Sequence, residues 1–283
     1  GRLLPRSGAL LLELETRNVD IGPGPVLLSP RDTAVMDTHP RLVWTRVAEA
    51  AEYEITIRGP VGAAIRLAAG EAGCGRGAGP WRDLDVCSWQ PSGKWPALEP
   101  GRPVFLKLGF RAAVRAPLRQ AREVFRVQLL DPGERLVVEE ELRQVSSLGI
   151  DSGSRLLLAA GVYARAGLHY DAIVAYDAAL QAQEMPEVRV TLGDLFSTLG
   201  LTALAERQYR RVLDHTPERT TQAAAELGLG QVTYLRTLYD DARSHFERAR
   251  DLYSALGLVA EAEAARAAAA RAQAAAAGSP PPY

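Results

Sequence analysis

The second half of this 283-residue chain repeats one pattern of small and aromatic residues at a nearly fixed spacing. The first copy comprises Ala160, Tyr163, Gly167, Ala172, Tyr176 and Ala179; Gly193, Phe196, Gly200, Ala205, Tyr209 and Val212 match it 33 residues later, and Gly230, Thr233, Thr237, Ala242, Phe246 and Ala249 match it after 37 more. A period of this length is typical of stacked helix pairs, because each pair buries its apolar face only against the next pair. The pattern therefore predicts helices throughout this region.

The residue types at these positions have a physical role in helix packing. Small residues at Ala160, Gly193 and Gly230 allow paired helices to approach closely, and the aromatic residues fill the gap between one pair and the next. Gly167 and Gly200 are expected to end the first helix of their pairs, where a residue that tolerates positive φ is preferred. Each copy is thus expected to be one antiparallel helix pair.

These residue classes at these offsets resemble the tetratricopeptide repeat (TPR) family, with Pro217 at the position of that family's terminal proline. The resemblance implies three repeats over residues 153–256 and an Ala-rich closing helix from Leu258 to Ala277, so that the α-helical TPR solenoid extends over residues 153–277. Thr237 stands where the first two copies have glycine, and residues 278–283 are expected to form a disordered tail.

The first half differs in composition and pattern. It contains 13 of the 18 prolines, 16 of the 25 glycines and all four tryptophans. Apolar and polar residues alternate over 41–47, 53–57, 104–110 and 123–129, with weaker candidates at 9–19 and 25–28. Several short strands separated by turn residues indicate an antiparallel β-sandwich. We expect this sandwich over residues 26–131, after an N-terminal extension, residues 1–25, that could supply an extra strand.

The same region resembles the fibronectin type III/Ig-like family. The resemblance rests on Pro40, Leu42, Trp44, Val47, Ala50, Tyr53, Ile55 and Ile57, followed by the turn from Leu98 to Gly101. It implies that a buried Trp44 packs under a strand that opens with Tyr53. The sequence departs from the family at Val104, where a corner tyrosine is usual, and in the long excursion over residues 70–96.

Residues 132–152 are expected to form a linker helix between the two domains. If this helix packs on the first repeat, the two domains move as one body. If it does not, Gly149 to Gly153 is a hinge.

The excursion contains both cysteines of the chain, Cys74 and Cys87, in a Gly-rich loop. In an exported protein they would form a disulfide, and in the cytosol they would stay reduced. A zinc site needs four ligands, which this pair does not provide, so we expect no metal. Trp81, Trp89 and Trp95 lie in the same loop. They could form an aromatic surface for a carbohydrate or a partner, or cover one end of the sandwich.

The family's groove positions can be carried over one by one. The resulting candidate partner-binding groove is Arg165, Glu187, Asp194, Ser197, Gln231, Tyr234 and Leu235. A groove with these side chains could hold a partner segment of mixed polarity, such as a helix. Alternatively, these side chains are only solvated or are covered by the linker helix.

Charge and motifs exclude several functions. The net charge of −1 gives no reason to expect nucleic acid, and no apolar run reaches the roughly 18 to 20 residues that span a bilayer. His39, His169, His215 and His245 have no matching nucleophile motif or His pair. We therefore expect no enzyme activity and no cofactor.

These observations predict a non-enzymatic protein interaction or scaffold module, in which the groove docks a protein partner and the sandwich is a spacer or second contact. The cysteine pair, the sandwich and the start at Gly1 rather than Met favour a bacterial envelope, periplasmic or extracellular location. Two alternatives remain: a carbohydrate-binding sandwich on a helical stalk, and a sensory or regulatory part of a larger envelope protein.

Overall fold

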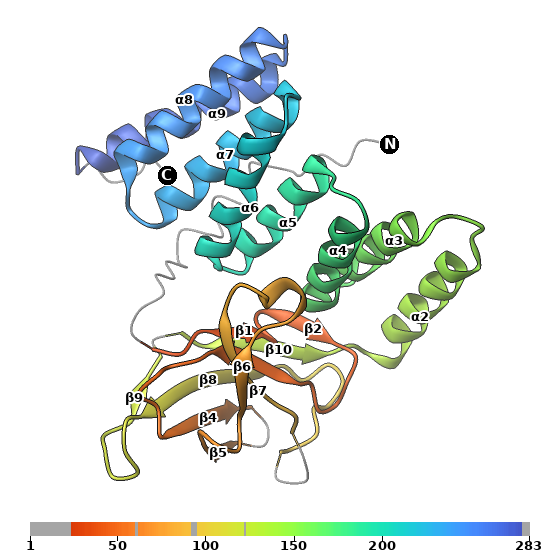
Figure 1. The fold of residues 1–283 in the computed structure, drawn as a ribbon, viewed down its shortest axis with the longest axis vertical. Coiled ribbons are helices and arrows are strands. Elements are labelled where there is room, and N and C mark those ends of the chain that lie inside the picture. The colour runs from red at the N-terminus through yellow and green to blue at the C-terminus, as the bar shows by residue number, and fades with distance from the viewer. Residues whose placement is uncertain (1–23, 60–61, 92–94, 122, 279–283) are drawn as a thin grey trace. The chain divides into compact units, whose positions relative to one another are not determined.

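The computed structural model describes residues 24–278, apart from 60–61, 92–94 and 122. Within these residues, β-strands forming two sheets precede eight α-helices (Figure 1). The chain divides into two compact units, of which one is Ile21–Glu184 and the other contains Met185–Tyr283. The predicted order of β structure followed by α structure is confirmed. The strand considered at residues 9–19 and the tail at 279–283 lie outside the described residues.

The first sheet has four strands in the order β1 (Leu27–Ser29), β3 (Leu42–Thr45), β7 (Asp85–Trp89) and β6 (Gly73–Arg76). All of its strand pairs are antiparallel. The prediction of a loop over 70–95 was wrong, because β6, a short 3-10 helix (η1, Gly79–Trp81) and β7 lie there. Strand β6 is a glycine-rich edge strand without alternating apolar residues, and only its pairing with β7 makes it a strand.

The second sheet follows the order β2 (Thr33–Val35), β10 (Phe125–Leu129), β8 (Val104–Arg111), β4 (Glu52–Arg58) and β5 (Ala63–Ala68), and β9 (Arg119–Gln120) also pairs with β8. Only the β2–β10 pair is parallel, so the sheet is mixed. Apolar side chains of both sheets join one buried cluster, which includes Leu42 and Trp44 from the first sheet and Tyr53, Ile55 and Phe110 from the second. The strands predicted from alternation over 41–47, 53–57, 104–110 and 123–129 are confirmed, whereas β2, β5 to β7 and β9 were missed.

Three helices belong to the same compact unit as the sheets: α2 (Pro132–Ser147), α3 (Ser152–Arg165) and α4 (His169–Ala182). Helix α2 is the predicted linker helix. Its Val138 shares a buried cluster with Val162 of α3 and with Leu130, at the end of the strand region. The linker helix therefore packs on the first helix pair, which is the first of the two alternatives considered for it.

The turn between α3 and α4 is bonded directly to strand β2. Gly167 adopts a φ of 70°, and its carbonyl oxygen accepts a hydrogen bond of 2.9 Å from the Ala34 N–H and one of 2.9 Å from the Thr33 hydroxyl. The His169 N–H in turn donates to Thr33 Oγ1 at 2.9 Å. The left-handed turn that the sequence placed at Gly167 is thus also a docking point for the sheet.

A second set of contacts joins α4 to η1. Arg82 forms an ion pair with the buried Asp177, and the Trp81 ring stacks on Tyr170 with 6.4 Å between the ring centroids. These contacts explain why the compact unit ends after Glu184 and includes three helices beyond the last strand.

The second unit contains α5 (Pro186–Thr198), α6 (Thr202–His215), α7 (Arg219–Leu235), α8 (Tyr239–Ala255) and α9 (Val259–Ala276). Residues with positive φ follow α5, α7 and α8: Gly200 at 69°, Thr237 at 61° and Gly257 at 71°. The helix ends predicted at Gly167 and Gly200 are confirmed. Thr237 adopts the same backbone conformation without being glycine, so helix α7 also ends at the predicted repeat position.

Candidate functional site

In the second unit, the Tyr209 ring of α6 packs against helices α5 and α7. This ring is fully buried and touches the backbone of two glycines, Gly193 on α5 and Gly228 on α7. A Cβ atom at Gly193 would lie 2.6 Å from the ring, and one at Gly228 would lie 2.4 Å from it. Gly230 bears the same relationship to Phe246 of α8, at 2.5 Å. Small residues therefore receive aromatic rings of neighbouring helices, as the repeat pattern predicted.

The Tyr209 hydroxyl donates a hydrogen bond of 2.7 Å to Asp194 Oδ1 on α5. Burial raises the pKa of Asp194 to about 6, although the bond from Tyr209 opposes this rise. The pKa of Tyr209 is also raised, by burial first and then by the carboxylate. Asp194 was predicted to face a partner, but its carboxylate is engaged by the chain itself.

The other candidate groove residues divide into two groups. Ser197 is 1% exposed and Leu235 is also buried, so neither presents its side chain to a partner. Glu187 is exposed, whereas Gln231 and Tyr234 are partly exposed. The surface left from the predicted groove in this unit is therefore Glu187, Gln231 and Tyr234, on α5 and α7.

Tyr234 is itself partly occupied by packing. It lies against the cluster formed by Phe246 of α8 and Ala268 of α9, and its ring is 5.3 Å from that of Tyr239. The closing helix α9, rather than an external partner, provides part of this contact. Arg165 belongs to the other compact unit, where its side chain pairs with Glu141 of α2 at 2.8 Å.

A buried carboxylate between α7 and α8 was missed by sequence reasoning. Glu226 Oε2 lies 2.6 Å from His245 Nδ1, and Arg248 Nε donates to Glu226 Oε1 at 3.1 Å. Burial would raise the pKa of Glu226, but the bonds to His245 and Arg248 outweigh it and lower the pKa. His245 follows Glu226 by nineteen residues, a separation that no short motif detects. The three side chains join α7 to α8 and have no nucleophile among them.

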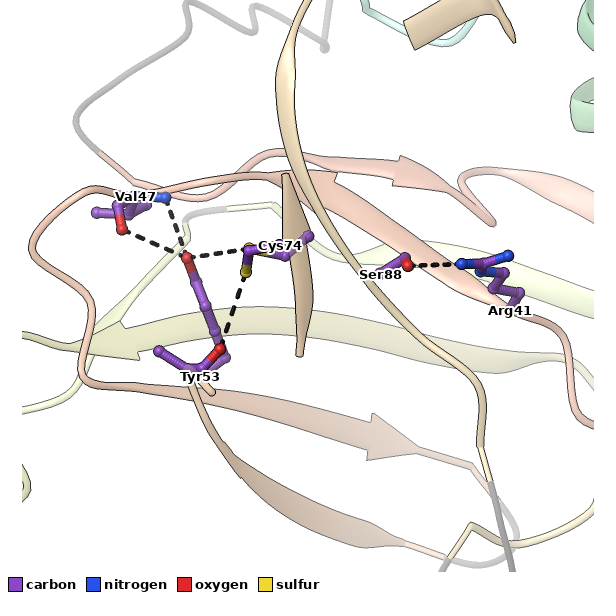
Figure 2. Close-up of a disulfide and its surroundings, with 7 residues drawn as sticks. Arg41, Val47, Tyr53, Cys74 and Ser88 are labelled. Carbon is purple, nitrogen blue, oxygen red and sulfur yellow. Dashed lines mark hydrogen bonds between the residues drawn. A yellow bond between two sulfur atoms is a disulfide. The ribbon is translucent and has the colours of Figure 1, made fainter. Parts of the chain in front are cut away.

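The cysteines form the predicted disulfide, which joins the directly opposed Cys74 of β6 and Cys87 of β7. Cys87 is fully buried, and its sulfur lies 3.6 Å from the Tyr53 hydroxyl. That hydroxyl accepts a hydrogen bond of 3.0 Å from the Val47 N–H (Figure 2). Trp44, paired with Cys87 across the strands, packs edge-on against Tyr53. The disulfide therefore lies at the margin of the buried core and holds the edge strand to it.

The three tryptophans near the disulfide do not form an exposed aromatic surface. Trp81 and Trp95 are each 3% exposed, and Trp89 is partly buried against the core with its ring centroid 5.9 Å from that of Trp95. This burial removes the feature on which the carbohydrate-binding alternative depended. The structure instead gives these rings the packing role that was considered beside it.

Two further properties concern metals and membranes. Within residues 24–278 and outside the gaps noted above, no group of three His, Cys, Asp or Glu side chains is placed to hold a metal ion. Among the helices of the same residues, none is long and apolar enough to cross a bilayer.

No protein-family model matches the chain, and no curated protein matches it. Among solved structures, BtubC (BKLC) from P. vanneervenii is similar over 54% of this chain and 78% of its own, with 21% identity and a TM-score of 0.35. Astrotactin-2, described as a conserved vertebrate-specific and perforin-like membrane protein involved in neuronal development, is similar over 73% of this chain and 38% of its own, with 14% identity and a TM-score of 0.26.

Proposed function

We propose that this chain is a non-enzymatic interaction module whose helices form a TPR-like solenoid that docks a partner protein. One recurring contact carries the proposal: a small residue on one helix receives an aromatic ring of a neighbouring helix, at Gly193 and Gly228 with Tyr209 and again at Gly230 with Phe246. Helix pairs that stack through such contacts present the first helices of successive pairs on one surface. Repeat arrays of this kind recognise partners by extended shape.

In the same proposal, the two sheets form a fibronectin III/Ig-like sandwich that serves as a spacer or second contact. Sandwiches of this class have strands ABED in one sheet and CFG in the other. Strands β1, β3, β7 and β6 lie in the order A, B, E and D, while β4, β8 and β10 lie in the order C, F and G. The edge-on contact of Trp44 with Tyr53, at 5.3 Å between centroids, supports the same assignment.

The docking face that we propose comprises Glu187 on α5, which contacts Thr221 at the start of α7, and the partly exposed Gln231 and Tyr234 further along α7. Its chemistry is mixed: one carboxylate, one amide and one aromatic ring. Such a face suits a partner helix that offers both polar and apolar groups.

We place this module in a bacterial envelope or extracellular assembly. The disulfide between Cys74 and Cys87 supports this location, because disulfides persist in oxidising compartments and are rare in the cytosol.

The test is site-specific photo-crosslinking in the cells that make the protein. A crosslinking amino acid at Glu187 or Gln231 should capture the same partner, whereas one at Arg211, an exposed position on α6, should not. Capture from Arg211 alone, or no capture from Glu187 and Gln231, would contradict the proposed docking face. Asp194→Arg is unsuitable as a probe, because loss of the hydrogen bond from the buried Tyr209 would make any effect on binding inseparable from unfolding.

A further inference from the structure

The outer face of the mixed sheet carries an exposed phenylalanine between two arginines. Phe105 on β8 is directly opposite Arg126 on β10 and Arg58 on β4. Directly opposed residues in a sheet point to the same face, so the three side chains form a row across three strands. Phe105 is 41% exposed, while its neighbours Val104 and Leu106 are buried in the core. The strands of this row are labelled in Figure 1.

A third cation lies on the same face. Lys107 follows Phe105 by two residues on β8, and alternate residues of a strand share a face. The acidic side chains of this face are already paired: Glu54 binds Arg66 at 3.1 Å and Arg111 at 3.3 Å, and Glu52 binds Arg111 at 3.2 Å. Arg58, Lys107 and Arg126 form no ion pair with any residue that the structure describes. The Arg126 guanidinium donates a hydrogen bond to Gln128 Oε1, and the Arg126 N–H donates to Asp32 Oδ1 at 3.1 Å. Among the described residues, the three cations around the Phe105 ring thus have polar neighbours but no carboxylate in an ion pair.

We propose that this basic sheet face, defined as Arg58, Phe105, Lys107 and Arg126, binds an acidic segment of a partner protein. The Phe105 ring is the apolar anchor, and the three cations pair with carboxylates on either side of it. This site uses no residue of the helices, so it goes beyond the docking face proposed above.

The size of the face favours a protein over a membrane or a nucleic acid. Neighbouring strands are about 4.8 Å apart and alternate residues about 6.8 Å apart, so the four side chains cover roughly 10 by 7 Å. Three cations alone would give weaker than about millimolar binding to an anionic membrane. They would also neutralise only about three phosphates of a nucleic acid. By contrast, the buried centres of protein interfaces are enriched in aromatic residues and arginine, which are the side chains that this face combines.

The test uses the full chain and a fluorescein-labelled peptide of alternating Glu and Leu residues, with the Gln-for-Glu peptide as reference. We expect the acidic peptide to bind, and to shift the NMR signals of amides in β4, β8 and β10. Arg58→Glu and Arg126→Glu should each weaken binding about tenfold or more, and Phe105→Ser should do so without removing a charge. Arg46→Glu is the matched control, because Arg46 is exposed and follows β3 of the other sheet.

Several outcomes would overturn the proposal. The acidic peptide could fail to bind at millimolar concentration, or Arg46→Glu could weaken its binding as much as Arg58→Glu and Arg126→Glu do. The Gln-for-Glu peptide could also bind as tightly as the acidic one. Tighter binding of phosphatidylglycerol vesicles or of a single-stranded oligonucleotide than of the peptide would show that the partner class is wrong.

Discussion

The Tyr209 hydroxyl donates a hydrogen bond to Asp194 Oδ1 at 2.7 Å, while the ring of the same tyrosine lies against Gly193 and Gly228. One side chain thus fills the space that two helices leave open and also supplies the polar partner of a carboxylate in the same place. This double role makes the α5–α6–α7 packing sensitive both to pH and to the smallest increase in side-chain volume.

The first prediction concerns pH. The folded-state pKa of Asp194, about 6, is above its ordinary value of 3.8. A raised pKa means that this group's contribution to stability is complete below about pH 3.8 and is lost as pH rises through 6. The loss amounts to about 3 kcal/mol at most. Urea unfolding followed by circular dichroism should therefore show that Asp194→Asn becomes more stable relative to the wild type between pH 4 and 7.5.

The amide of the Asn variant can still accept the bond from Tyr209, so this comparison isolates the charge. If the free energies of unfolding of the two proteins change with pH in the same way over this range, the Asp194 carboxylate is not desolvated in the folded state.

The second prediction concerns the glycines. Gly228→Ala would place a methyl group 2.4 Å from Tyr209 Cζ, a distance that forces α6 and α7 apart. Overpacking of a core costs about 1–3 kcal/mol, and we expect a loss in the free energy of unfolding at the upper end of that range. Gly161→Ala is the control, because the nearest atom to its Cβ would be in the Arg165 guanidinium, at an ordinary contact distance of 3.8 Å, and alanine favours the helix. The glycine contact is unimportant if both variants unfold at the same urea concentration.

Thr237 provides a stabilising prediction. Its φ of 61° is unfavourable for a β-branched residue, whereas glycine adopts it without strain. Thr237→Gly should raise the stability of the second unit by about 1 kcal/mol, measured as a higher melting temperature. Thr237→Ala keeps the strained backbone and should gain less. A lower melting temperature for the glycine variant would contradict the backbone argument.

The disulfide carries the fourth prediction. Native protein should show no titratable thiol, and Cys74→Ala with Cys87→Ala should destabilise the sheet unit by about 3 kcal/mol, because the bond closes a loop between residues 13 apart. Cys87 is fully buried beside Tyr53, so removal of the disulfide should also change the tyrosine fluorescence of the folded protein. Rapid labelling of both cysteines in the folded protein would exclude the bond.

Local patterns were sufficient for elements whose cause is local. Alternation over 53–57 and 104–110 predicted β4 and β8 because each strand has one buried face. The recurrence of glycine at Gly167 and Gly200 predicted the helix ends because a positive φ is a property of one residue. Strand β6 and the engagement of Asp194 were beyond such reasoning. Pairing with β7 makes β6 a strand, and a tyrosine on another helix bonds the Asp194 carboxylate.

The amino-acid sequence by itself determined the order of strands and helices, the repeat of small and aromatic positions and the two cysteines that pair. Only the tertiary structure decided that the helix pair α3–α4 belongs with the sheets. The hydrogen bond from the Thr33 hydroxyl to the Gly167 carbonyl and the ion pair between Arg82 and Asp177 join them. It also decided which groove residues stay accessible. The reason is physical. Periodicity in the sequence indicates which face of a helix or strand is buried. Hydrogen bonds and ion pairs between residues more than ninety positions apart in the sequence depend on how the helices and strands pack against one another.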